Sequence, residues 1–164
     1  MEPWEQVLRQ EIRRAARVAV IGVGNTARGD DAAGALAARK LLGGRLPLPE
    51  KALVIDAGEV PENFTGVVRA FAPDFAVIVD SAAAGRPPGA VFLLDPDEVA
   101  DEDISTHRLP LTRLARYLRE TMDCRVSILG IEPLSFEPGT PVTPAVGRAV
   151  RRVVSALRSA LGAG

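Results

Sequence analysis

The run Val18-Ala-Val-Ile-Gly22 decides the fold class, because it is apolar, has the length of one strand and ends at a glycine. Stretches with helical spacing of apolar residues lie on either side of it. The first covers residues 3–16, and the second covers residues 31–42 and ends at Gly43-Gly44. A strand without polar positions is buried on both faces, which is typical of parallel sheets covered by helices.

The same alternation of apolar runs and amphipathic stretches continues to the end of the chain. Further strands are predicted at residues 52–56, 75–80, 90–94 and 125–130. Further helices are predicted at about 61–70, at 109–121 and from Pro144 to about Leu161, with Thr143 as the N-cap of the last. The pattern predicts an α/β protein, a three-layer α/β/α fold with a twisted, mostly parallel five-stranded central sheet. We expect one domain over residues 1–164, in which residues 1–16 form an N-terminal helical extension.

Charge and composition narrow the classes of partner. Lys and Arg number 20 and Asp and Glu number 21, so no strong field of one sign favours binding to nucleic acid or to an anionic membrane. Apolar runs such as 75–79 are far shorter than the roughly 20 residues of a membrane helix, and residues 1–17 do not resemble a secretory signal. We therefore expect no membrane insertion and a cytoplasmic location.

Cys124 is the only cysteine, which excludes an intrachain disulfide and a cysteine-rich metal site. It directly precedes the predicted strand 125–130, at the end away from the expected site. We expect a buried, unreactive thiol there.

The expected site lies beyond the carboxyl ends of the strands, as is the rule for sheets of this class. Three acidic positions follow strands there: the pair Asp30-Asp31 in the first connection, Asp56 after the second strand and Asp80 at the end of an otherwise apolar strand. Helix capping would explain one member of the pair, which leaves Asp31 to face the crevice. Asp56 is a weaker candidate of the same kind, because it is followed by Ala57-Gly58 and organising that turn would be enough to explain it.

The first connection also fits a loose dinucleotide fingerprint, Gly22-Val-Gly24-Asn-Thr-Ala27. Two observations argue against that interpretation. The next helix would begin with two aspartates, which repel a pyrophosphate, and Asp56 lies about 30 residues on, where a ribose-binding acid is expected after about 20.

His107 is the only histidine and lies at a predicted loop-to-helix junction. Two carboxylates and one imidazole form an oxygen, oxygen and nitrogen set that suits nickel, iron or zinc, with coordination positions left open. A Ser81–His107–Asp triad is the alternative, but no Gly-x-Ser-x-Gly elbow or oxyanion-hole pattern accompanies Ser81. The zinc-protease motif HExxH is absent.

Six short motifs in this order resemble those of the nickel–iron hydrogenase maturation proteases, closest to the branch that serves formate-hydrogenlyase-type hydrogenases. The resemblance covers about residues 17–160. The motifs are Gly22-Val-Gly24-Asn25 with Gly29-Asp30-Asp31 and Gly34; Val54-Ile-Asp56-Ala-Gly58 with Pro61-Glu62-Asn63; Ile78-Val-Asp80-Ser-Ala; Pro88-Gly89; Ser105-Thr-His107-Arg-Leu-Pro110-Leu; and Leu129-Gly130-Ile-Glu132-Pro133 with Thr143-Pro144.

The resemblance implies an endopeptidase that removes the C-terminal extension of a nickel–iron hydrogenase large-subunit precursor after nickel insertion. It implies that Asp31, Asp80 and His107 contact the metal, which belongs to the substrate, with Asp30 and Asp56 as possible supporting residues behind them. No organic cofactor is expected. Glu132 stands where many family members carry Gln or an apolar residue, which leaves its role open.

Two other functions remain compatible with the sequence. One is a nickel-binding accessory protein that docks on the large subunit without cutting it. The other is a small-molecule amidohydrolase or nucleotide binder on the same fold. Neither the cleavage site nor the oligomeric state follows from the residues.

Overall fold

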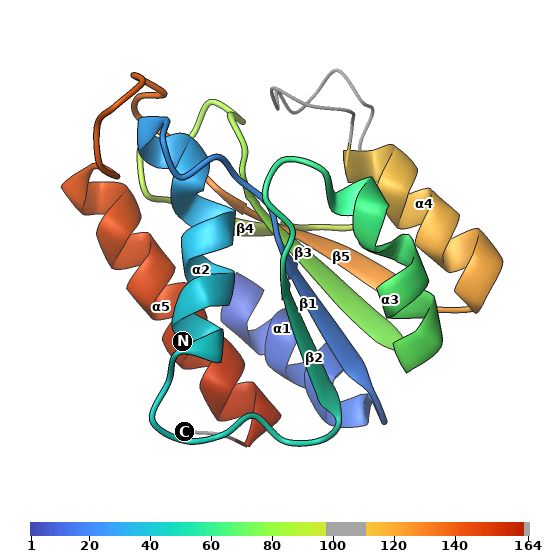
Figure 1. Cartoon of the computed structure of the whole chain (residues 1–164). Coiled ribbons are helices and arrows are strands. Elements are labelled where there is room, and N and C mark those ends of the chain that lie inside the picture. Colours follow the sequence, from blue (N-terminus) through green and yellow to red (C-terminus); the bar gives the residue numbers. More distant parts are fainter. Residues whose placement is uncertain (98–110, 163–164) are drawn as a thin grey trace.

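The computed structural model describes residues 1–97 and 111–162, and the elements alternate along the chain (Figure 1). The helices are α1 (Pro3–Arg14), α2 (Ala33–Leu42), α3 (Thr65–Phe71), α4 (Leu111–Met122) and α5 (Pro144–Leu161), and two short 3₁₀ helices are η1 (Gly29–Ala32) and η2 (Pro61–Phe64). The strands are β1 (Val18–Gly22), β2 (Ala52–Asp56), β3 (Phe75–Ser81), β4 (Val91–Leu94) and β5 (Arg125–Ile131).

These strands form one five-stranded sheet in the order β2-β1-β3-β5-β4. Four strands are parallel, and β4 runs antiparallel to β5 at the edge. The antiparallel direction follows from the short 82–90 connection, because a parallel partner would need a crossover of a dozen or more residues. The prediction of a mostly parallel five-stranded sheet is therefore confirmed.

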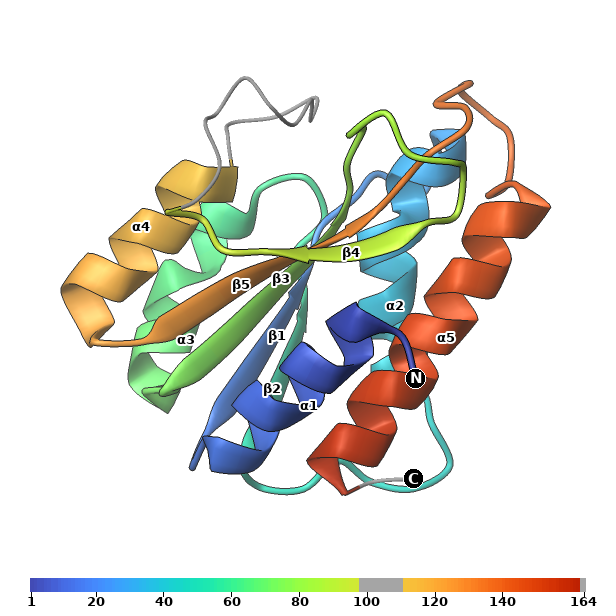
Figure 2. The same cartoon turned by 180° about the vertical axis from the view of Figure 1, so that it is seen from behind.

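Helices cover both faces of the sheet, with α1, α2 and α5 on one face and α3 and α4 on the other (Figures 1 and 2). Successive residues of a strand point to opposite faces, so each parallel strand contributes side chains to the hydrophobic core on either side of the sheet. On β3, for example, Phe75, Val77 and Val79 pack under the first group of helices. Their neighbours Ala76 and Ile78 pack under the second group. This double burial is why the strands contain almost no polar residues.

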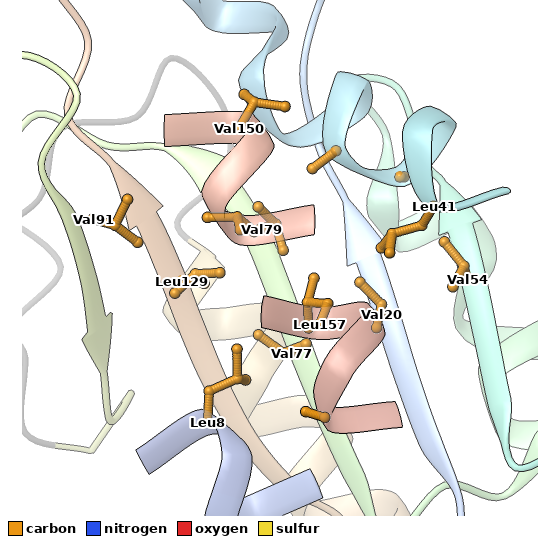
Figure 3. Close-up of a cluster of buried hydrophobic side chains, with 14 of the residues drawn as sticks. Leu8, Val20, Leu41, Val54, Val77, Val79, Val91, Leu129, Val150 and Leu157 are labelled. Atoms are coloured by element: carbon orange, nitrogen blue, oxygen red, sulfur yellow. The ribbon is translucent and has the colours of Figure 1, made fainter. Parts of the chain in front are cut away.

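The larger core lies under α1, α2 and α5 (Figure 3). Leu8 from α1 and Leu157 from α5 meet Val77 on the sheet, while Leu41 from α2 lies near Val20 and Val54 (Figure 3). Residues 1–16 were expected as an extension, and their helix contributes fully buried side chains to this core. The N-terminal helix is thus part of the packed structure.

Helix α2 lies unusually close to the sheet. A Cβ atom added at Gly34 would lie 2.0 Å from the carbonyl oxygen of Val79, and one at Gly22 would lie 2.3 Å from the carbonyl oxygen of Gly34. Two glycines facing each other let the backbones approach at a distance that no larger residue permits. This approach brings the residues before α2 over the end of β3.

Several predicted boundaries shift by one to three residues. The predicted helix 31–42 divides into η1 and α2, and the predicted helix at 61–70 divides into η2 and α3, because the first turn of each is a tighter 3₁₀ turn. The predicted helix 3–16 ends at Arg14, and strands β3 and β5 each continue one residue further than predicted. Among the described residues, no helix combines the length and apolar character needed to cross a bilayer.

Candidate functional site

Two buried carboxylates at the carboxyl end of β3 both accept a hydrogen bond from Ser81. Asp80 is fully buried, and Asp31, from η1, is 3 % exposed. Ser81 lies between them: its backbone N–H donates to Oδ1 of Asp80 at 2.8 Å, and its hydroxyl donates to Oδ1 of Asp31 at 3.4 Å. Asp31 and Asp80 thus share one donor residue on the central strand, although Ser81 lies 50 positions after Asp31 in the chain.

The loop after β1 holds Asp31 in place. The backbone N–H of Asn25 donates to Oδ2 of Asp31 at 3.2 Å. Gly24 allows the loop to fold back this far, since a Cβ there would lie 2.2 Å from the carbonyl oxygen of Asp31. The Asp31 carboxylate therefore already accepts the hydrogen bond of a loop amide that a bound phosphate would need. This agrees with the argument against a dinucleotide site.

Asp30 points away from this pair and anchors a different part of the chain. Its fully buried carboxylate accepts hydrogen bonds from the backbone N–H groups of Leu134, Ser135 and Thr143, at 2.7 to 3.1 Å, and from the Thr143 hydroxyl. It thereby ties the 132–143 connection and the start of α5 to η1.

The capping interpretation of the acidic pair is wrong. Neither η1 nor α2 has a side-chain cap, because both carboxylates are engaged elsewhere. Thr143 is the N-cap residue of α5, as predicted. Its hydroxyl donates to Asp30, however, and makes no capping hydrogen bond to its own helix.

Asp56 lies at the same end of the sheet but faces another partner. Its Oδ2 accepts a hydrogen bond from Nε of Arg39 at 2.7 Å, and its Oδ1 accepts one from the N–H of Gly58 at 3.3 Å. Gly58 has φ +56°, a conformation that favours glycine. Asp56 therefore organises the turn after β2, as the sequence suggested.

His107 lies outside the described residues, so the third member of the predicted set stays a prediction. Within residues 1–97 and 111–162, no group of three His, Cys, Asp or Glu side chains could hold a metal ion by itself. The donor chemistry of Asp31 and Asp80 fits a cation that a third ligand completes, since carboxylate oxygens bind divalent metals well.

Glu132, whose role the sequence left open, is a buried carboxylate one strand away from Asp80. It follows β5 directly and is 5 % exposed, and its Oε2 accepts a hydrogen bond from the N–H of Ala84 at 2.8 Å. Its own backbone binds both Gly89 and Ala90. Glu132 thus holds both ends of the connection that follows Asp80, and an acid next to an apolar strand was the only signal of this in the sequence.

Buried carboxylates are the electrostatic feature of this end of the sheet. A buried carboxylate is costly to desolvate in its charged form, and a cation beside it lowers that cost. The Ser81 hydroxyl, considered above as a nucleophile, donates to Asp31 and is 2 % exposed. The Ser81 hydroxyl is therefore an internal hydrogen-bond donor to Asp31 in this structure.

Comparison with known proteins gives a consistent family. A family model described as hydrogenase maturation protease matches residues 37–160. The chain is 35 % identical over 144 residues to the hydrogenase 3 maturation protease of Escherichia coli, which covers 87 % of this chain and 89 % of that protein. It is 31 % identical over 136 residues to a putative hydrogenase maturation protease of Methanocaldococcus jannaschii, covering 79 % of each.

Solved structures extend the likeness to the fold. The crystal structure of a NiFe hydrogenase maturation protease from Thermococcus kodakarensis superposes with a TM-score of 0.87 at 31 % identity, covering 95 % of this chain and 99 % of that one. The crystal structure of a hydrogenase 3 maturation protease superposes with a TM-score of 0.74 at 33 % identity, over 85 % of this chain and 88 % of that one.

Proposed function

This chain belongs to the hydrogenase maturation protease family, and from that premise we propose that it removes the C-terminal extension of a nickel–iron hydrogenase large-subunit precursor after nickel insertion. The family is one of peptidases, so the chain is a hydrolase. The substrate of the proposal is a folded precursor that already carries its nickel. Cleavage then reports that metal insertion is complete.

Asp31, Asp80 and His107 recognise the nickel in this proposal. The observation that supports it is that the buried Asp31 and Asp80 both accept a hydrogen bond from Ser81 at the carboxyl end of the central strand β3. Two anionic oxygens and a neutral imidazole leave coordination positions open, which the ligands of the precursor would fill. A metal-free precursor lacks the charge that compensates the two carboxylates, so it would bind weakly.

The chain's own groups also offer the proton transfer that peptide hydrolysis requires. A carboxylate of Asp31 or Asp80 that does not contact the metal can accept a proton from the attacking water and pass it to the leaving amine. Burial of both side chains keeps other water away from the reacting bond.

The test is incubation of a nickel-loaded large-subunit precursor with the purified protein, followed by intact mass spectrometry. We expect the precursor to lose a mass equal to its C-terminal extension. The variants Asp31→Asn, Asp80→Asn and His107→Ala should each slow cleavage by at least about a hundredfold, since each removes one proposed metal contact.

Asp56→Asn is the matched control, because Asp56 also ends a strand at this edge but is held by Arg39 and Gly58. We expect it to retain most of the wild-type rate. An unchanged precursor mass with binding intact would favour a non-cleaving accessory role. Full cleavage by the Asp31 or His107 variant, or equal cleavage of nickel-free precursor, would contradict recognition of the metal by these residues.

A further inference from the structure

A basic groove runs between α1 and α5, on the helical face that contains the larger core. It has a volume of about 550 Å³, and its lining includes four arginines and a single carboxylate, that of Glu5. The arginines are Arg9 from α1 and Arg148, Arg151 and Arg152 from α5. Figure 2 shows the two helices side by side on this face. The groove is remote in chain position from Asp31 and Asp80, and α1 lies before the residues 37–160 that the family model matches.

Most of this positive charge is uncompensated. Arg152 pairs with Glu2 at 2.8 Å and donates to the carbonyl oxygen of Gly89. Within residues 1–97 and 111–162, by contrast, no carboxylate lies within ion-pairing distance of Arg9, Arg148 or Arg151. Exposed like charges gathered in this way repel each other, so an anionic partner would bind here favourably.

Arg9 supplies a second, independent observation. Its Nη1 donates to the Ser159 hydroxyl at 3.0 Å, which fixes the guanidinium against α5. Its Nε is buried and has no hydrogen-bond partner in the described part of the chain. A buried donor without a partner costs free energy, so the groove is lined by an arginine that has a donor left unused.

We propose that this groove binds an acidic segment of a partner polypeptide. Arg148 and Ser159 are eleven residues apart on α5, so the groove floor is about 16 Å long, which matches about five extended residues. Carboxylates on such a segment can form paired hydrogen bonds with guanidinium groups. Glu5 and the hydroxyls of Ser155 and Ser159 suit the backbone N–H and C=O groups of a peptide, which the sugar–phosphate backbone of a nucleic acid does not offer.

The test uses a fluorescein-labelled hexaglutamate peptide and fluorescence anisotropy at low ionic strength. Arg148→Glu/Arg151→Glu reverses two exposed charges of the groove, and we expect it to weaken binding about tenfold or more. Lys40→Glu/Arg45→Glu is the matched control, because it makes the same change in net charge at exposed positions at the end of α2 and in the following loop. We expect the control to change the affinity by less than about twofold.

Three outcomes would overturn the proposal. One is equal loss of affinity in both double variants, which would mean attraction by net charge alone. Another is equal binding of hexaglutamine. The third is tighter binding of hexathymidylate than of hexaglutamate, with loss in Arg148→Glu/Arg151→Glu, because the groove would then recognise a phosphate polymer. None of these readouts depends on cleavage, so they stand apart from the peptidase assignment.

Discussion

At the scale of single residues, the adjacent Asp30 and Asp31 point to different parts of the structure and have different hydrogen-bond partners. Asp30 faces the 132–143 connection and accepts hydrogen bonds from three backbone N–H groups, while Asp31 faces the end of β3 and Ser81. The tight 3₁₀ geometry of η1 turns consecutive side chains to different sides. One carboxylate therefore stabilises the fold while its neighbour remains at the candidate site.

Asp30→Asn should lower the free energy of unfolding by about 3 kcal/mol, because an amide group would face backbone donors that are buried with it. Thr143→Val removes only one hydroxyl from the same cluster and should cost about 1 kcal/mol. Urea unfolding followed by circular dichroism measures both values. A loss in Asp30→Asn no larger than in Thr143→Val would mean that the carboxylate does not anchor the connection.

Cys124 gives a prediction about pH. Burial raises the pKa of this thiol from 9.0 to about 11; the charges of Asp74 and Asp123 add to the rise, and those of Arg125 and Arg119 oppose it. The unfolded chain ionises first as pH rises, so the contribution of this thiol to stability is complete below about pH 9 and is lost as pH passes about 11.

Iodoacetamide at pH 8 should therefore modify Cys124 slowly in the folded protein and rapidly in urea, as followed by mass spectrometry. Equally rapid modification in both states would contradict the buried, unreactive thiol that the sequence predicted.

At the scale of elements, the residue after β5 holds the connection that follows β3, the strand on which Asp80 lies. Residues 82–90 leave the sheet directly after Asp80 and Ser81 and return as β4. The Glu132 side chain holds Ala84, and the Glu132 backbone holds Gly89 and Ala90. The connection is thus fixed at both ends by one residue.

Glu132→Leu should release Ala84 and slow precursor cleavage by about tenfold or more, since a misplaced connection disturbs substrate binding beside Asp80. Glu132→Gln keeps an acceptor oxygen for the Ala84 N–H and should stay within about threefold of the wild-type rate. Single-turnover cleavage at several precursor concentrations separates binding from the chemical step. A wild-type rate in Glu132→Leu would show that the connection needs no such anchor.

At the scale of the whole molecule, α1 closes the larger core from the N-terminal side. Trp4, Leu8 and Ile12 are buried on one face of the helix, where they pack toward α5 and the sheet. The same helix supplies Arg9 and Glu5 to the basic groove. One face of this amphipathic helix therefore stabilises the core, and another face places charged side chains in the groove.

Leu8→Ala should lower the free energy of unfolding by about 3 kcal/mol, because it removes a fully buried side chain from this core. Val7→Ala is the matched control on the same helix, since Val7 is 47 % exposed, and should cost less than about 0.5 kcal/mol. Equal, small losses in both would mean that α1 is only loosely attached.

The sequence alone was sufficient to predict the layered fold and nearly all of its elements. Strands such as β3 are apolar up to their last two residues because both faces are buried, and that composition is visible without coordinates. The boundaries of η1 and η2 were missed, because a 3₁₀ turn and the first turn of an α-helix contain the same residue types.

For the candidate site, the sequence predicted candidate residues, and only the tertiary structure decided which groups each of them contacts. Asp31 and Asp80 stand out in the chain because charge is rare beside buried strands. Their shared donor Ser81, the anchoring by Asp30 and the reach of Glu132 depend on contacts between segments 48 to 113 residues apart. Local patterns record which residues are buried, but which distant partner satisfies a buried carboxylate is settled only when the sheet and its connections pack together.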